Sequence, residues 1–88
     1  MIMSAPEREK SYHFDRPGHY RIRVIGYLDE NWSDRFAGMH ITKSSPKDQV
    51  PVTSLVGHLR DQAELAGVLN TLYQMHLTLR SVEYLYGD

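Results

Sequence analysis

Apolar and polar residues alternate along residues 20–28, and this is the clearest strand pattern in the chain. The apolar positions are Tyr20, Ile22, Val24 and Leu28, and the positions between them include Arg21, Arg23 and Tyr27. Successive side chains of a strand point to opposite faces, so the pattern predicts a strand with one apolar and one mixed face. Gly26 interrupts it, which indicates a bulge or the close approach of a neighbouring ring.

Three further segments are rich in strand-forming residues. Residues 39–43 alternate in polarity, and the run SSPKDQ at 44–49 has the composition of a turn. Residues 50–59 follow, but Pro51 cannot donate to a sheet, so this strand is expected to start at Val52. Residues 77–86 complete the set.

Residues 62–75 carry apolar side chains at helical spacing. The apolar stripe consists of Leu65, Val68, Leu69, Leu72 and Met75. Asp61 and, three positions later, Glu64 are typical of a capped helix start. No glycine follows the helix, so His76 or a close neighbour is expected to end it, because histidine tolerates the left-handed conformation better than most residues.

A shorter helical turn is predicted between the first two strands. Trp32 and Phe36 are four residues apart, so one turn would place both rings on the same side. Asn31 or Ser33 is the expected cap, and Gly38 the expected stop. We expect the two rings to plug one end of the core.

These elements predict an α+β fold, with a small, mostly antiparallel sheet of about four strands covered by one main amphipathic helix. If the Trp32 segment is a loop, the first three strands form a meander, giving β-β-β-α-β. If it is a helix, the order is that of a ferredoxin-like βαββαβ sandwich. The connection of about ten residues is at the lower limit for a helical crossover, which favours the meander.

Composition predicts one domain. The chain has 88 residues, 41% hydrophobic and 24% charged, with no cysteine to form a disulfide. Residues 19–88 are expected to form the domain, and the polar residues 1–18 a flexible N-terminal arm. A small core without disulfides makes oligomerisation the remaining means of stabilisation.

The start of the chain lacks the apolar core of a signal peptide, and no stretch approaches the ~18 apolar residues of a membrane helix, so we expect a cytoplasmic protein.

Four motifs carry a resemblance to a known group. They are YRIRV at 20–24, LDENWSD at 28–34, DQA at 61–63 and LRSVE at 79–83. On them the chain resembles, from about residue 19 to 85, a family of small uncharacterised bacterial proteins, and the resemblance implies no particular activity. The family pattern has a second aromatic where Arg35 lies, which argues against an aromatic cage around Trp32. It has a glycine where His76 lies, so the end of the helix is expected to have a different shape here.

Catalytic and cofactor signatures are weak. Histidines lie at 13, 19, 40, 58 and 76 without metal-ligand spacing, and three could converge only if strands bring His19, His40 and His58 together. No cofactor or metal is predicted. The acids Asp29, Glu30 and Asp34 beside Trp32 are better explained as turn caps than as catalytic groups. Ser33 has no nucleophile-elbow context, and no phosphate-binding loop is present.

The main helix offers a candidate interface. Its outward stripe consists of Ala63, Gly67, Asn70, Thr71 and Gln74. No charged residue occurs from Leu65 to Thr78, whereas an exposed helix face normally carries Lys and Glu. Small Ala63 and Gly67 would let a second backbone approach, and Asn70 with Gln74 could bond across a twofold axis.

The favoured function is therefore a non-enzymatic interaction or regulatory module that forms a homo-oligomer or docks onto a larger protein. An alternative is a small-molecule-binding or cofactor-free oxygenase-like dimeric domain, with a pocket of Tyr20, Trp32, His40 and Tyr84. A second alternative is a single-stranded nucleic-acid binder using Arg21, Arg23 and Tyr27. The net charge of −1 argues against it, and cross-strand pairing with Glu83 is the competing explanation for the arginines.

Overall fold

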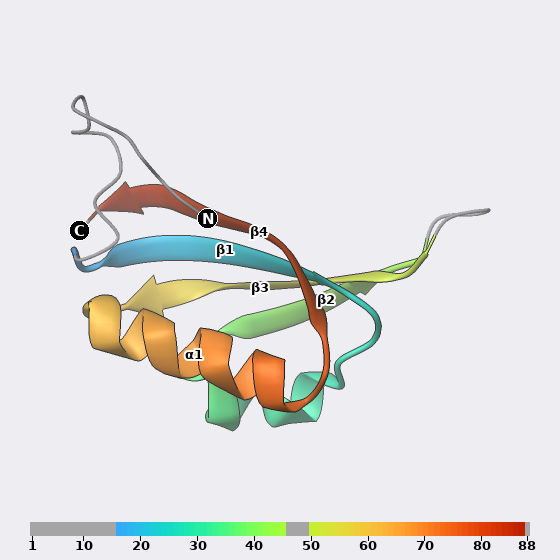
Figure 1. Ribbon diagram of the computed structural model, residues 1–88. Coiled ribbons are helices and arrows are strands. Elements are labelled where there is room, and N and C mark those ends of the chain that lie inside the picture. The colour runs from blue at the N-terminus through green and yellow to red at the C-terminus, as the bar shows by residue number, and fades with distance from the viewer. Residues whose placement is uncertain (1–15, 46–49, 88) are drawn as a thin grey trace, which may run out of the picture.

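The computed structural model describes residues 16–45 and 50–87, and in this part of the chain four strands form one sheet with a helix across one face (Figure 1). The elements are β1 (Gly18–Ile25), the 3-10 helix η2 (Glu30–Phe36), β2 (His40–Ser44), β3 (Val52–Leu59), α1 (Gln62–Gln74) and β4 (Thr78–Gly87). The α+β class and the single main covering helix are confirmed. Most of the predicted arm, and positions 46–49 of the predicted turn, lie outside the described residues.

The strand order is β2-β3-β1-β4, and every neighbouring pair is antiparallel. It follows that β1 and β2 are parallel with β3 between them, and that β3 and β4 are parallel with β1 between them. Each parallel pair is joined by a helical crossover, through η2 and α1 respectively. This is the ferredoxin-like alternative, and the meander favoured by the loop length is wrong. A 3-10 helix rises about 2 Å per residue, so the seven residues of η2 span the crossover with a short connection.

The core lies between the sheet and the two helices. Its sheet side follows the expected alternation, since every second residue of β1 from Tyr20 is buried. The buried hydrophobic residues are Tyr20, Ile22, Val24, Leu28, Phe36, Met39, Ile41, Leu55, Leu59, Leu65, Val68 and Leu72. The last three come from α1, so the predicted apolar stripe of the helix does face the sheet.

The η2 helix contributes one of its two rings to the core. Phe36 is fully buried, whereas Trp32 remains 37% exposed, with the Arg35 guanidinium 5.0 Å from its ring centre. The helix cap is Asp29, whose side chain accepts a hydrogen bond from the backbone N–H of Asn31 at 2.9 Å. The prediction of Asn31 or Ser33 as cap is therefore wrong, because the helix begins earlier than the aromatic spacing indicated.

A buried threonine closes the turn after β1. Thr53 Oγ1 donates to the carbonyl of Gly26 at 2.6 Å and accepts from the backbone N–H of Leu28 at 3.2 Å. Gly26 itself has a φ of +118°, which an L-residue rarely adopts, and its N–H donates to Pro51 O at 2.9 Å. Gly26 therefore ends β1 in a sharp turn and is not an interruption within the strand.

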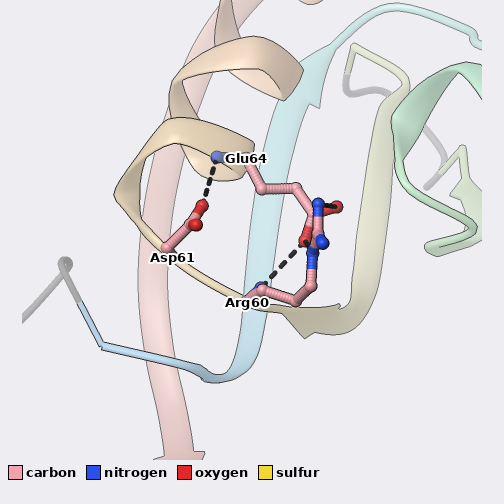
Figure 2. A network of polar contacts seen from close by, with 3 residues as sticks. All are labelled: Arg60, Asp61 and Glu64. Carbon is pink, nitrogen blue, oxygen red and sulfur yellow. Dashed lines mark hydrogen bonds and ion pairs between the residues drawn. The ribbon is translucent and has the colours of Figure 1, made fainter.

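The start of α1 is capped as predicted. Asp61 Oδ1 accepts from the backbone N–H of Glu64 at 2.9 Å, and Glu64 Oε1 accepts from the backbone N–H of Arg60 at 2.8 Å (Figure 2). The return bond reaches one residue earlier than in a standard capping box. The Arg60 side chain also bonds Glu64, so three donors converge on this carboxylate.

The end of α1 confirms the role predicted for His76. Its φ is +63°, the left-handed conformation. The N–H of His76 donates to Tyr73 O at 2.9 Å, and the N–H of Leu77 donates to Leu72 O at 3.2 Å. These two bonds define a Schellman motif, which satisfies carbonyls that the end of a helix leaves open.

The Glu64 cap should make stability depend on pH. The hydrogen bond from the Arg60 backbone, followed by that from its side chain, lowers the pKa of Glu64. A lowered folded-state pKa contributes stability above the unfolded pKa, and this stability is lost as pH falls through the folded pKa. We expect Glu64→Gln to lower the free energy of unfolding by about 0.3–1 kcal/mol at neutral pH and to match wild type at strongly acidic pH. Urea titrations across pH check this, and a deficit that persists in acid would contradict it.

Candidate interaction surface on the main helix

The structure places the five predicted interface residues together on the side of α1 that faces away from the sheet. They are Ala63, Gly67, Asn70, Thr71 and Gln74, all exposed except the half-buried Thr71. A Cβ added at Gly67 would meet nothing within 4 Å beyond its chain neighbours and the backbone of its own helix, so this face is open. Thr71 Oγ1 donates to Gly67 O at 2.9 Å, which leaves the exposed Asn70 and Gln74 amides as the main polar groups of the stripe.

This face lacks formal charge. The charged side chains of the first turn, Glu64 with its partner Arg60, precede a stretch from Leu65 to Leu79 that contains no Asp, Glu, Lys or Arg. A solvent-facing helix surface in a soluble protein is normally rich in such residues. The surface can therefore be brought against another uncharged surface without desolvating an ionised group.

An open groove continues the surface at the end of α1. It has a volume of about 490 Å³ and is lined by Leu69, Leu72, Tyr73, His76, Leu77, Thr78 and Leu79. Tyr73 is 77% exposed and Leu79 is 49% exposed. Sequence reasoning missed both as site residues. The signal for Tyr73 was an aromatic residue at a non-core position of the helical wheel, three residues after Asn70.

The four residues of the predicted pocket are distributed over both faces of the sheet and the η2 helix. Tyr20 and Tyr84 meet edge to face at 5.2 Å between ring centres, on the face covered by α1. His40 lies on the other face, because both of its chain neighbours point into the core and successive strand residues alternate. Trp32 is on η2. The structure therefore brings the two tyrosines together and separates His40 from them.

The predicted nucleic-acid contacts include one arginine that is already paired. Arg21 lies opposite Glu83 in the β1–β4 register, and its Nε donates to Glu83 Oε1 at 2.6 Å. This bond lowers the pKa of Glu83, and the competing explanation of cross-strand pairing is confirmed for Arg21. Arg23 lies two residues along β1, and Tyr27 lies beyond the strand, where its hydroxyl donates to Ser45 Oγ at 3.0 Å.

Two histidines meet on the face of the sheet opposite α1. His19 and His58 are register partners in β1 and β3, with ring centres 5.3 Å apart, and His19 also stacks on Tyr86 at 4.5 Å. His40 lies opposite Val56 and so one row away. Within residues 16–45 and 50–87, no three His, Asp or Glu side chains are grouped so that they could hold a metal ion. His13 lies outside the described residues.

The fold and this surface define a small α+β domain of two interleaved, split β-helix-β units with an uncharged helix face left open. A family model described as a domain of unknown function (DUF8691) matches residues 19–83, and the chain belongs to this family. No curated protein and no solved structure matches it. In the described ranges, no helix has the length and apolar character required to cross a bilayer.

Proposed function

We propose that this domain is a non-enzymatic protein-interaction module that self-associates through the outward face of α1. The observation that carries the proposal is the open, uncharged stripe around Gly67, where a Cβ would meet nothing. A chain of 88 residues without disulfides has a small core, so burial of additional surface in an oligomer stabilises it. The proposal places the module in the bacterial cytoplasm, in keeping with the resemblance of its motifs to small bacterial proteins.

The stripe has the chemistry of a self-complementary contact. In a twofold contact each residue meets the same patch of the other copy. Ala63 and Gly67 are small enough to let two helices approach closely. The Asn70 and Gln74 amides each carry both a donor and an acceptor, so each can bond its counterpart in the second copy.

The non-enzymatic part of the proposal is supported by the contacts of Asp29, one of the three candidate acids, and of Ser33. The Asp29 carboxylate accepts the hydrogen bond from Asn31 N–H that caps η2. Ser33 Oγ, in the same helix, donates to Met39 O at 2.7 Å and so holds the backbone just before β2. Both groups have structural roles, and that of Asp29 is in line with its interpretation as a cap.

Gly67→Arg tests the proposed surface. We expect light scattering behind a sizing column to show wild type rising with concentration from the 10.2 kDa monomer towards twice that mass. The variant should remain monomeric, because two arginines would face each other across the twofold axis and block close approach. Thr42→Arg, at an exposed position of β2 away from α1, is the matched control and should behave as wild type. Monomer mass for wild type and both variants would end the self-association proposal.

A further inference from the structure

We infer that Tyr73 is the anchor of the self-association and that it inserts into the open groove between α1 and β4 of a second copy. The inference rests on the proposed function and goes beyond it by naming the side chain and the recess that hold two copies together. Tyr73 lies outside the predicted stripe, on the border between the stripe and the groove, four residues after Leu69.

The patch supplies both halves of a contact. An isologous interface pairs one patch with itself, so the same patch must carry a projecting group and a recess to receive it. Tyr73 projects, with 77% of its surface exposed. Beside it lies the groove of about 490 Å³, whose apolar wall includes Leu72, Leu77 and Leu79. A tyrosine ring suits this place because it buries a large apolar area at low entropy cost and leaves a hydroxyl for the polar rim.

Charge points to a second copy as the occupant. The surface from Leu65 to Leu79 has no formal charge, so it cannot form ion pairs with a charged partner. The ions of such a partner would be desolvated without a counter-charge, which is unfavourable. A second copy presents the same uncharged surface. Twofold pairing of this segment therefore brings no like charges of its own together, and along the chain the first charged residues on either side are Glu64 and Arg80.

The size of the patch determines the affinity that we expect for the dimer. The five stripe residues and the seven groove residues number about half of the ~20–30 residues that each side of a standard interface contributes. A dimer of this size belongs to the weak, transient class. We expect a monomer–dimer equilibrium with a dissociation constant of about 1–100 μM, in which one anchor contributes a large share of the affinity.

The test is sedimentation equilibrium of the whole chain over about 1–500 μM, a range set by the expected affinity. Tyr73→Ala should weaken dimerisation at least tenfold, because it removes the projecting ring. Tyr73→Phe should stay within about threefold of wild type, since the ring is retained. Tyr27→Ala is the matched control, because Tyr27 is a tyrosine with 59% exposure that lies outside the patch. Its loss should leave the dissociation constant of the dimer unchanged. Tyr73 is too exposed for its loss to unfold the domain, and circular dichroism verifies this.

The outcomes separate this inference from the proposed function. Wild type that stays monomeric at all concentrations removes both. Wild type that dimerises, with Gly67→Arg monomeric and Tyr73→Ala as tight as wild type, leaves the proposed function standing and overturns Tyr73 as the anchor. Loss of dimerisation in Tyr73→Ala with retention in Tyr73→Phe and Tyr27→Ala supports the inference.

Discussion

Replacing Phe36 with alanine should lower the free energy of unfolding by about 3–5 kcal/mol, the largest effect that we expect from a single truncation of a side chain outside the sheet. The ring of Phe36 is fully buried at the end of η2, among core residues from the sheet and α1. Its removal deletes buried apolar surface and leaves a cavity that the short η2 helix cannot easily fill. A small domain is stabilised by only about 5–15 kcal/mol, so a large part of the total would be lost.

Trp32→Ala is the matched control for this prediction. Trp32 lies four residues earlier in the same helix, but its ring is 37% exposed and contacts Arg35 at the surface. We expect its truncation to cost no more than about 1 kcal/mol, the size of a surface cation–π contact. Urea denaturation monitored by circular dichroism measures both variants, and equal losses would show that η2 does not seat Phe36 as described.

Thr53→Val should lower the free energy of unfolding by about 2–4 kcal/mol, although valine has nearly the same shape as threonine. The hydroxyl of Thr53 bonds the Gly26 carbonyl and the Leu28 N–H at the same time. Valine would leave both backbone groups without this partner in the core. An unpaired buried polar group costs about 1–3 kcal/mol, and here two are involved. The turn after β1 should loosen, and with it the entry to η2.

Two substitutions control for the Thr53 prediction. Thr53→Ser keeps the hydroxyl and should retain most of the stability, losing chiefly the packing of one methyl group. Thr42→Val, at an exposed position of β2, should change stability by less than about 0.5 kcal/mol. Thermal melts and urea titrations measure all three. If Thr53→Val proved as stable as wild type, the two hydrogen bonds would have no net role in closing this turn.

Several features could be predicted from short stretches of residues. The Asp61 and Glu64 cap, the left-handed His76 and the alternation around Ile22 all appear where the local pattern indicated. The two helix ends depend on contacts within about five residues of chain, such as a side chain bonding a backbone group one turn away, and the alternation follows from the two-residue period of a strand. At the helix ends the neighbours in sequence are also the neighbours in space.

The candidate site could be predicted only in part. The stripe around Gly67 follows from helical periodicity, because residues opposite Leu65, Val68 and Leu72 must face away from the sheet. The groove beside Tyr73 could not be found in this way. It exists because β4 begins next to the last turns of α1, and the exposure of Leu79 depends on β4 being the edge strand.

Periodicity and end signals, which are local interactions, thus determined the types of the strands and of α1, but not the start of η2. The strand order, the choice of Phe36 over Trp32 for the core, and the Arg21–Glu83 pair were decided by tertiary structure alone. These depend on which distant segments meet, and a strand pattern records only that a partner is required and not which strand provides it. The connection between β1 and β2 forms a crossover because the short η2 helix packs against the core through the buried Phe36. The length of the connection alone does not reveal this contact.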